Sequence, residues 1–283
     1  MNKLALGLVG LMLMLFSCSS DSSGSDSPVV VAPSALVKKI TTSDSAGKLL
    51  VTTTFSYDGN KIVSESWKQN SFSMGTDVGY SYRMDYTYTG NLITNIKVNN
   101  IFGAPEKLVM STNFVYDSNE NLISSIREQY FDSFKMIFKV LYTNIDNNTQ
   151  EFKMFTTDSR DNIENSSASG KIVFDANRNI IKMGSIDGTN TYSSFEYDLK
   201  SNPKKNILGF NKMIYFDLPP NFSVIYSKPH LDRSNTVLKT NISGYYPTTN
   251  QYTYNTNGYP IENKEYLVNN GDKLNAIFQY FYE

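Results

Sequence analysis

A short phrase of residues recurs along most of this chain, and it restricts the fold more than any other feature of the sequence. Each copy has two aromatic or aliphatic residues separated by one residue, then Asp, Thr or Asn, a turn rich in Gly and Asn, and Ile or Leu. The second residue of each aromatic pair falls at positions 57, 88, 116, 142, 174, 197, 254 and 280. These intervals of 23 to 32 residues, with one of 57, indicate a repeated β-hairpin.

The residues of each copy explain why it forms a hairpin. Asp58-Gly59-Asn60 and Thr89-Gly90-Asn91 tolerate the positive φ angles of tight turns. The strand that enters a turn alternates with a period of two. Along 80–88, one face carries Tyr80, Tyr82, Met84, Tyr86 and Tyr88, and the other carries Ser81, Arg83, Asp85 and Thr87. One face therefore packs and the other meets water, as in an antiparallel sheet.

The number of hairpins predicts the architecture. Two strands in each of eight or nine units give roughly 16–18 strands, and open sheets rarely exceed about 10 strands without curling or closing. We predict an all-β fold, an antiparallel meander of repeated β-hairpins rolled into a barrel or a strongly curved sheet. It forms a single domain over residues 35–283. Prolines in 202–207 and 217–221 cannot lie inside central strands, so we expect a loop-rich insertion at about 199–247.

The amino terminus has the layout of a targeting signal. Lys3 precedes an apolar run over 4–16, which is too short to span a membrane as a helix. Leu15-Phe16-Ser17-Cys18 resembles the lipobox of bacterial lipoproteins, and the resemblance implies a signal peptide over 1–17 and a lipid-modified Cys18. The following residues, rich in Ser, Gly and Asp, cannot bury enough surface to fold. We therefore expect a flexible tether that ends at residue 34.

The lipobox, the tether and the Tyr-Asp hairpins together resemble an uncharacterised family of Bacteroidota lipoproteins with a porin-like β-fold. The hairpin phrase also resembles the YD repeats of Rhs-like proteins. Two further segments contribute to the resemblance, Asp198 with Asn202-Pro203 and Lys205-Asn206-Ile207, and Tyr254-Asn255 with Asn257-Gly258-Tyr259-Pro260. The resemblance implies the β-fold and an outer-membrane location, facing either the periplasm or the cell exterior. It supplies no functional residues.

The composition excludes several kinds of site. A net charge of −1 argues against a nucleic-acid partner. The single Cys and the single His exclude cysteine-built or histidine-built metal centres, and we expect neither a metal nor a cofactor. His230 is interpreted as a solvent-exposed loop residue because no G-x-S-x-G motif accompanies it. The recurring acids are interpreted as turn caps. They are Asp58, Asp117, Asp175 and Asp198.

These observations predict a lipid-anchored, non-enzymatic cell-envelope protein with a binding or structural role. Its partners would be the membrane, through the lipid, and a glycan or another envelope protein. Two alternatives remain open, an outer-membrane β-barrel that serves transport and a glycan-active hydrolase with paired carboxylates. No catalytic residue is predicted. Trp67, the only Trp, is the candidate for an exposed contact residue.

Overall fold

The structure, a computed structural model, describes residues 35–70, 81–103, 105–214, 216–217, 228–229, 234–242, 246–268 and 271–283. The signal peptide, Cys18, the tether and His230 lie outside these residues, so the expectations stated for them stay predictions. The described residues belong to one structural unit, Ser34–Glu283.

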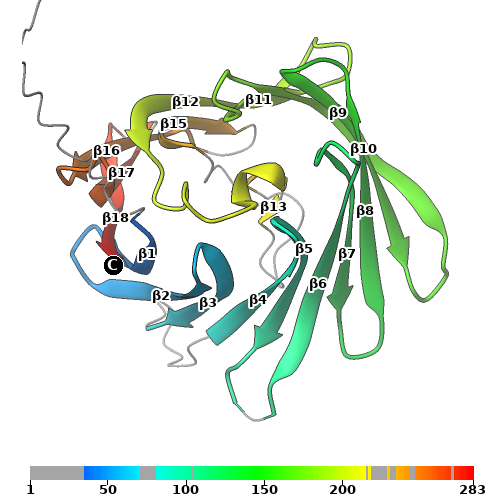
Figure 1. Cartoon of the computed structure of the whole chain (residues 1–283), viewed down its shortest axis with the longest axis horizontal. Helices are drawn as coiled ribbons and strands as arrows, with labels where there is room; N and C mark the ends of the chain where they lie inside the picture. The colour runs from blue at the N-terminus through cyan, green and yellow to red at the C-terminus, as the bar shows by residue number, and fades with distance from the viewer. Residues whose placement is uncertain are drawn as a thin grey trace, which may run out of the picture. The chain divides into compact units, whose positions relative to one another are not determined.

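Sixteen antiparallel strands close into a single barrel, and neighbours in sequence are neighbours in the sheet almost throughout (Figure 1). The predicted all-β antiparallel barrel is therefore confirmed. The strands are β1 (Val37–Asp44), β2 (Leu49–Asp58), β3 (Lys61–Gln69), β4 (Ser81–Thr89), β5 (Leu92–Asn100), β6 (Lys107–Tyr116), β7 (Leu122–Tyr130), β8 (Lys135–Asn144), β9 (Thr149–Asp158), β10 (Glu164–Phe174), β11 (Ile180–Gly184), β12 (Thr191–Ser201), β15 (Asn235–Ile242), β16 (Thr248–Tyr254), β17 (Pro260–Leu267) and β18 (Lys273–Tyr282). A separate pair, β13 (Phe216–Asp217) and β14 (Lys228–Pro229), and the 3-10 helix η1 (Phe210–Lys212) lie between β12 and β15.

The two faces of the wall differ in composition. Residues paired across neighbouring strands share a face, so the pairing register separates inner from outer side chains. One inner row runs through Phe55, Glu65, Met84, Val98, Met110, Gln129 and Met136. The adjacent outer row runs through Ser56, Ser64, Asp85, Lys97, Ser111 and Glu128. The predicted alternation is confirmed for the buried apolar cluster, which lies on the inside, whereas the outside carries polar and charged side chains together with the exposed Val115 and Leu141.

The tyrosines of the repeat join consecutive hairpins. The hydroxyl at the end of one strand donates to a backbone oxygen at the start of the preceding strand, at 2.7 Å from Tyr57 to Val37 and at 2.9 Å from Tyr116 to Ile93. Tyr197 and Tyr282 make the same bond to Ile180 and Pro260. The second aromatic residue lies at a shift of register in several copies, and such a bulge bends the strand end. The repeat therefore encodes the contact between hairpins as well as the turn.

The acidic residue of the repeat holds the turn, as predicted. Asp117 Oδ1 accepts bonds from the backbone N–H groups of Asn119 and Asn121, at 2.8 and 2.9 Å. Asp175 makes the same pair of bonds in the β10–β11 turn. The backbone N–H of Asn121 is the main cause of a lowered pKa at Asp117. Turn capping accounts for Asp117 and Asp175. The prediction is wrong for Asp198, which lies inside β12 and accepts bonds from the hydroxyls of Thr236 and Tyr254.

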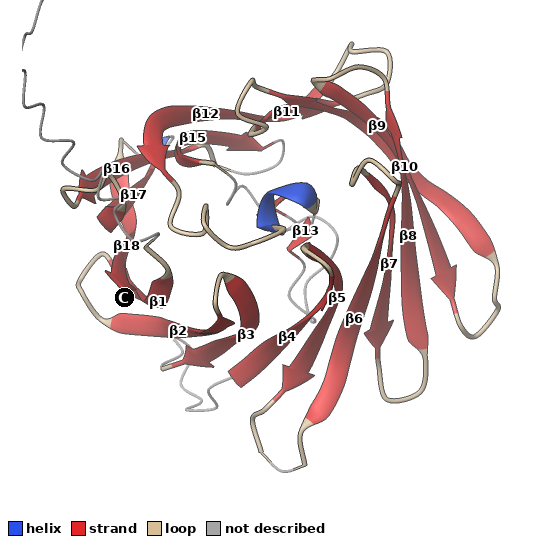
Figure 2. Ribbon diagram, viewed as in Figure 1, coloured by secondary structure: helices blue, strands red, loops and turns tan. Residues whose placement is uncertain are grey.

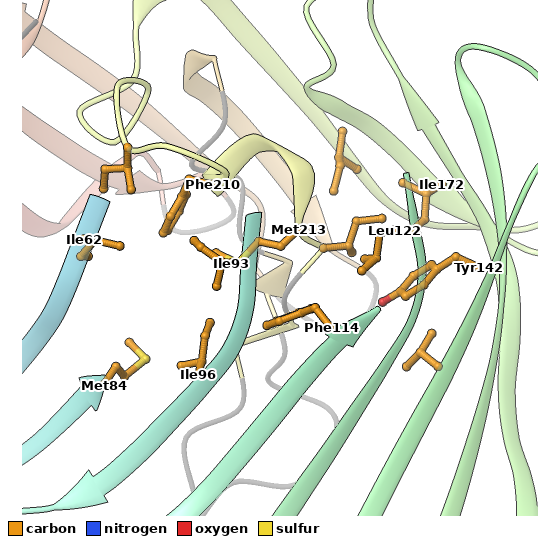
Figure 3. Packing of buried hydrophobic residues seen from close by; sticks show 14 of the residues in the cluster. Ile62, Met84, Ile93, Ile96, Phe114, Leu122, Tyr142, Ile172, Phe210 and Met213 are labelled. Carbon is orange, nitrogen blue, oxygen red and sulfur yellow. The ribbon is translucent and has the colours of Figure 1, made fainter. Parts of the chain in front are cut away.

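The segment 202–214, called here the inner segment, turns into the barrel at the rim where the short turns lie. We call this rim the turn end. Figure 2 shows η1 inside the ring of strands, and Figure 3 shows Phe210 and Met213 beside Ile93 and Leu122 of the wall. The backbone N–H of Leu208 donates to Asn60 in the β2–β3 turn. The predicted insertion at about 199–247 is shorter in the structure, because 235–242 form β15 of the wall.

Buried phenols make the stability of the barrel sensitive to alkali. Burial raises the pKa of Tyr88 to about 12 and also raises the pKa values of Tyr57 and Tyr282. Unfolded tyrosines ionise near pH 10, so the stability that the neutral phenols provide is complete below about pH 10 and is lost as the pH rises toward about 12. We expect the free energy of unfolding in urea to fall over this range. The fall should be shallower for Tyr88→Phe, whereas exposed Tyr246→Phe should match the native chain. Equal slopes for all three proteins would contradict this.

Candidate functional site

A buried ion pair fixes the inner segment to the wall. Lys204 Nζ lies 3.4 Å from Glu65 Oε2, and both side chains are almost inaccessible to water. Trp67 Nε1 donates to Glu65 Oε1 at 2.7 Å, and the Tyr86 hydroxyl donates to Oε2 at 3.3 Å. The Lys204 ammonium also lies 5.4 Å from the ring centres of Phe55 and Phe210, within cation–π range. The carboxylate and the ammonium are thus both compensated inside the barrel.

The contacts of Trp67 correct the expectation that it is exposed. Trp67 is paired with Thr53 and Tyr82 on the inner face of the sheet, and its ring is half-buried against the core. Its position two residues from Glu65 places both side chains on one face, because side chains alternate along a strand. Trp67 supports the buried ion pair, and any contact with a ligand would have to occur within the lumen.

A cavity of about 240 Å³ lies between the inner segment and the wall near the β1–β18 contact. Asn202 and Lys204 line it from the inner segment, and Tyr252, Phe278 and Tyr280 line it from the strands. The Tyr252 hydroxyl already donates to Val237 at 3.0 Å. The polar groups of this cavity hold the inner segment in place, so we consider a second cavity the better candidate for a ligand-binding site.

That second cavity, called here the turn-end groove, opens between the inner segment and the turns β6–β7, β8–β9 and β10–β11. Its volume is about 490 Å³, within the range of small-molecule sites. Amide side chains are unusually frequent in its lining. They are Asn121, Asn144, Asn147, Gln150 and Asn211. The groove also contains Glu120, Arg178 and Lys212, and the exposed side chain of Ile145.

Two residues of the groove occupy strained turn positions. Four turns share one hydrogen-bond pattern, in which the fourth residue donates to the first and the first donates to the fifth. The first residues are Asp44, Asp117, Asp175 and Asn255. The fourth residue has a positive φ in every case, and it is Gly47 or Gly258 away from the groove but Glu120 (φ 61°) or Arg178 (φ 65°) beside it. A non-glycine residue costs about 1–2 kcal/mol in this conformation. The groove therefore retains two long side chains where glycine would be more stable.

Gln150 is a buried residue in the lining of the groove. Its Nε2 donates to the backbone oxygen of Leu122 and to Asn144 Oδ1, both at 3.1 Å. These bonds fix the orientation of the amide. Its Oε1 is buried and accepts no hydrogen bond from the protein. Buried acceptors without a protein partner are uncommon in folded proteins.

The charges of the groove are mutually compensated. Lys212 Nζ lies 3.3 Å from Glu120 Oε2. Arg178 Nη1 donates to the backbone oxygen of Asn147 at 2.6 Å, and its guanidinium lies 4.1 Å from the ring centre of Phe174. Asp146 Oδ1 accepts from the backbone N–H of Asn148. The groove therefore offers oriented polar groups without a strong excess of either charge.

Two solved structures resemble this chain in fold. The chain is similar to two porin-like proteins. One, from Bacteroides uniformis ATCC 8492, is 12% identical with a TM-score of 0.48, and the match covers 87% of this chain and 98% of that protein. The other, from Bacteroides vulgatus ATCC 8482, is 11% identical with a TM-score of 0.36, and the match covers 88% and 99%. No family model and no curated protein sequence match the chain.

The described residues lack both a metal-binding cluster and a membrane-spanning helix. These residues contain no cluster of three or more His, Cys, Asp or Glu side chains that could hold a metal ion. Within the same residues, no helix has the length and apolar character needed to cross a membrane.

Sequence reasoning did not identify Glu65, Lys204 or the residues of the groove. One signal for the groove was present, since the fourth turn position changes from Gly to Glu120 and Arg178 in two copies of the repeat.

Proposed function

We propose that this chain is a lipid-anchored, non-enzymatic binding protein of the cell envelope, whose barrel is surrounded by water and does not span the membrane. Cys18 would carry the lipid and hold the protein at the outer membrane, as in the Bacteroidota lipoproteins that the sequence resembles. Binding would take place at the turn-end groove, where preformed polar groups converge. The side of the membrane is left to experiment.

The polar outer wall carries this proposal. Cross-strand ion pairs join Lys239 to Glu196 at 2.9 Å and Lys171 to Glu151 at 3.6 Å, and Lys97 lies in an outer row between Asp85 and Ser111. A membrane-spanning barrel has an apolar outer band and a polar interior, and each Lys or Arg at the bilayer centre costs about 2–4 kcal/mol. The outer wall here carries these charges and the apolar core cluster lies inside, which supports a barrel surrounded by water, although Val115 and Leu141 of the outer face are exposed and Glu65 and Arg127 face inward.

A second candidate function is transport by a membrane-spanning barrel. An even number of antiparallel strands closed into a barrel is the architecture of outer-membrane proteins, and this observation favours that alternative. The inner segment argues against an open channel at the turn end, because its buried side chains pack against the wall there. The two candidates differ in what attaches the protein to the membrane.

Membrane fractionation of the native chain and of Cys18→Ala separates them. We expect the native protein to remain with the membrane through a carbonate wash and Cys18→Ala to be soluble, with an unchanged unfolding temperature. A Ser19→Ala variant is the matched control and should fractionate like the native protein. If Cys18→Ala instead stays embedded and heat-modifiable on gels, the strands span the membrane and the water-exposed barrel is wrong.

A further inference from the structure

We propose that the turn-end groove binds a neutral saccharide, and that the amide side chains of the groove form hydrogen bonds with its hydroxyl groups. This inference rests on the proposed binding role and specifies its ligand. The amide side chains of the lining supply the first argument. A sugar presents neighbouring hydroxyls, each of which both donates and accepts, and an amide offers a donor and an acceptor in one plane. Asn147 in the β8–β9 turn and Gln150 at the start of β9 both line the groove, and they can engage different hydroxyls.

The charge arrangement selects a neutral ligand. Lys212 is paired with Glu120, and the Arg178 guanidinium is held by the backbone oxygen of Asn147 and the ring of Phe174. An anionic ligand would have to compete with these contacts, and a cationic ligand would meet Lys212 and Arg178. A neutral polyhydroxylated molecule can instead accept bonds from both cations without displacing them.

One apolar contact accompanies these polar groups. The exposed Ile145 side chain lies in the lining of the groove and offers a surface for the C–H face of a sugar ring.

The strained turns supply an independent argument. Residues held at positive φ without being glycine cluster at binding sites, because function keeps them against their conformational cost. The two glycine-free copies of the shared turn are the two whose side chains line the groove. Asn162 and Asp272 also have positive φ, but Asn and Asp tolerate it. Among the described residues, Glu120 and Arg178 are therefore the positions where a long polar side chain is present although its positive φ lowers the folding stability.

The binding experiment uses the purified full chain in detergent, titrated calorimetrically with neutral hexasaccharides of glucose, galactose, mannose or xylose. We expect at least one to bind. Asn147→Trp, which fills the groove, should weaken binding at least about tenfold. Asn257→Trp is the matched control, since Asn257 is an exposed residue of the β16–β17 turn outside the groove, and it should bind like the native chain.

Three outcomes would overturn the proposal. They are the absence of binding to all the neutral sugars, equal binding by Asn147→Trp and the native chain, and binding of oligogalacturonate or a Ser/Gly-rich peptide in their place. Because this assay uses purified protein, its failure leaves the fractionation result untouched. An embedded Cys18→Ala variant would likewise refute the water-exposed barrel and leave the saccharide result standing.

A stability measurement on Glu120→Gly provides a readout besides binding. Glycine relieves the positive φ, and the exposed pair with Lys212 contributes little, so the unfolding temperature should rise by about 2–4 °C. Saccharide binding should weaken severalfold in the same variant. Glu120→Asn, which tolerates this φ and keeps a polar side chain, should gain stability and lose less affinity. If Glu120→Gly gains stability and binds as tightly as the native chain, Glu120 has no part in the site.

Discussion

Replacing Lys204 with Met should lower the free energy of unfolding by about 3–5 kcal/mol, the usual cost of leaving one partner of a buried ion pair uncompensated. Glu65 would then remain as a buried carboxylate, held only by Trp67 and the Tyr86 hydroxyl. Its attraction to the ammonium 3.4 Å away would be lost, and the inner segment would lose its polar attachment to β3. Urea denaturation followed by tyrosine and tryptophan fluorescence measures the change.

Two further variants separate the charge from the general effect of mutation. Lys205→Met removes the neighbouring exposed lysine and should change stability by less than about 0.5 kcal/mol. The double variant Glu65→Gln/Lys204→Met removes both charges and should recover most of the loss, because a neutral buried pair avoids the desolvation cost of ions. If Lys204→Met alone is as stable as the native chain, the ion pair does not hold the inner segment.

Gly209→Ala should be the second most damaging of the variants considered. Gly209 has a φ of 74°, and a Cβ there would lie 2.6 Å from the backbone oxygen of Asn91 and 3.2 Å from the nitrogen of Ile93. The backbone of the inner segment approaches the β4–β5 turn too closely for a side chain. We expect a conformational cost of about 1–2 kcal/mol plus an overpacking cost of about 1–3 kcal/mol.

Gly258→Ala is the matched control for this prediction. Its φ of 77° is almost the same, but its nearest neighbour would be Lys200 Cδ at 3.8 Å, an ordinary contact. The control should therefore show the conformational cost alone. Chemical denaturation of both variants gives the difference, and equal losses would show that the inner segment does not press against the β4–β5 turn.

The sequence predicts those parts of the fold that are encoded locally. The turn at Asp58-Gly59 and the alternation over Tyr82–Tyr88 each depend on residues within one hairpin, and both are found as expected. The number of strands and the closed sheet follow from repeating that unit. The strand β15 escaped prediction because Asn235–Ile242 lacks the aromatic pair and the tight turn of the repeat.

The candidate site depends on contacts between distant residues, which no local pattern reveals. Glu65 and Lys204 are separated by 139 positions, and each alone has the appearance of an ordinary surface residue. Trp67 was expected to be exposed for the same reason, because the distant Lys204 that compensates its inward-facing partner Glu65 cannot be recognised from the local sequence. One feature of the sequence does indicate the groove. Glu120 and Arg178 occupy turn positions that hold Gly in the equivalent turns.

The tyrosine contacts between hairpins also bear on the order in which the chain folds. The hydroxyls of Tyr57, Tyr116 and Tyr197 bond to the strand before them, so hairpins can be added one after another through short-range contacts. Closure differs, since it pairs Ile40 with Tyr280 and joins segments 240 residues apart. The entropy of closing so long a loop is recovered only when β1 and β18 meet, which makes this step slow and late. Until then, β1 and β18 are unpaired edges, and the growing sheet is most exposed to self-association at the two ends of its own sequence.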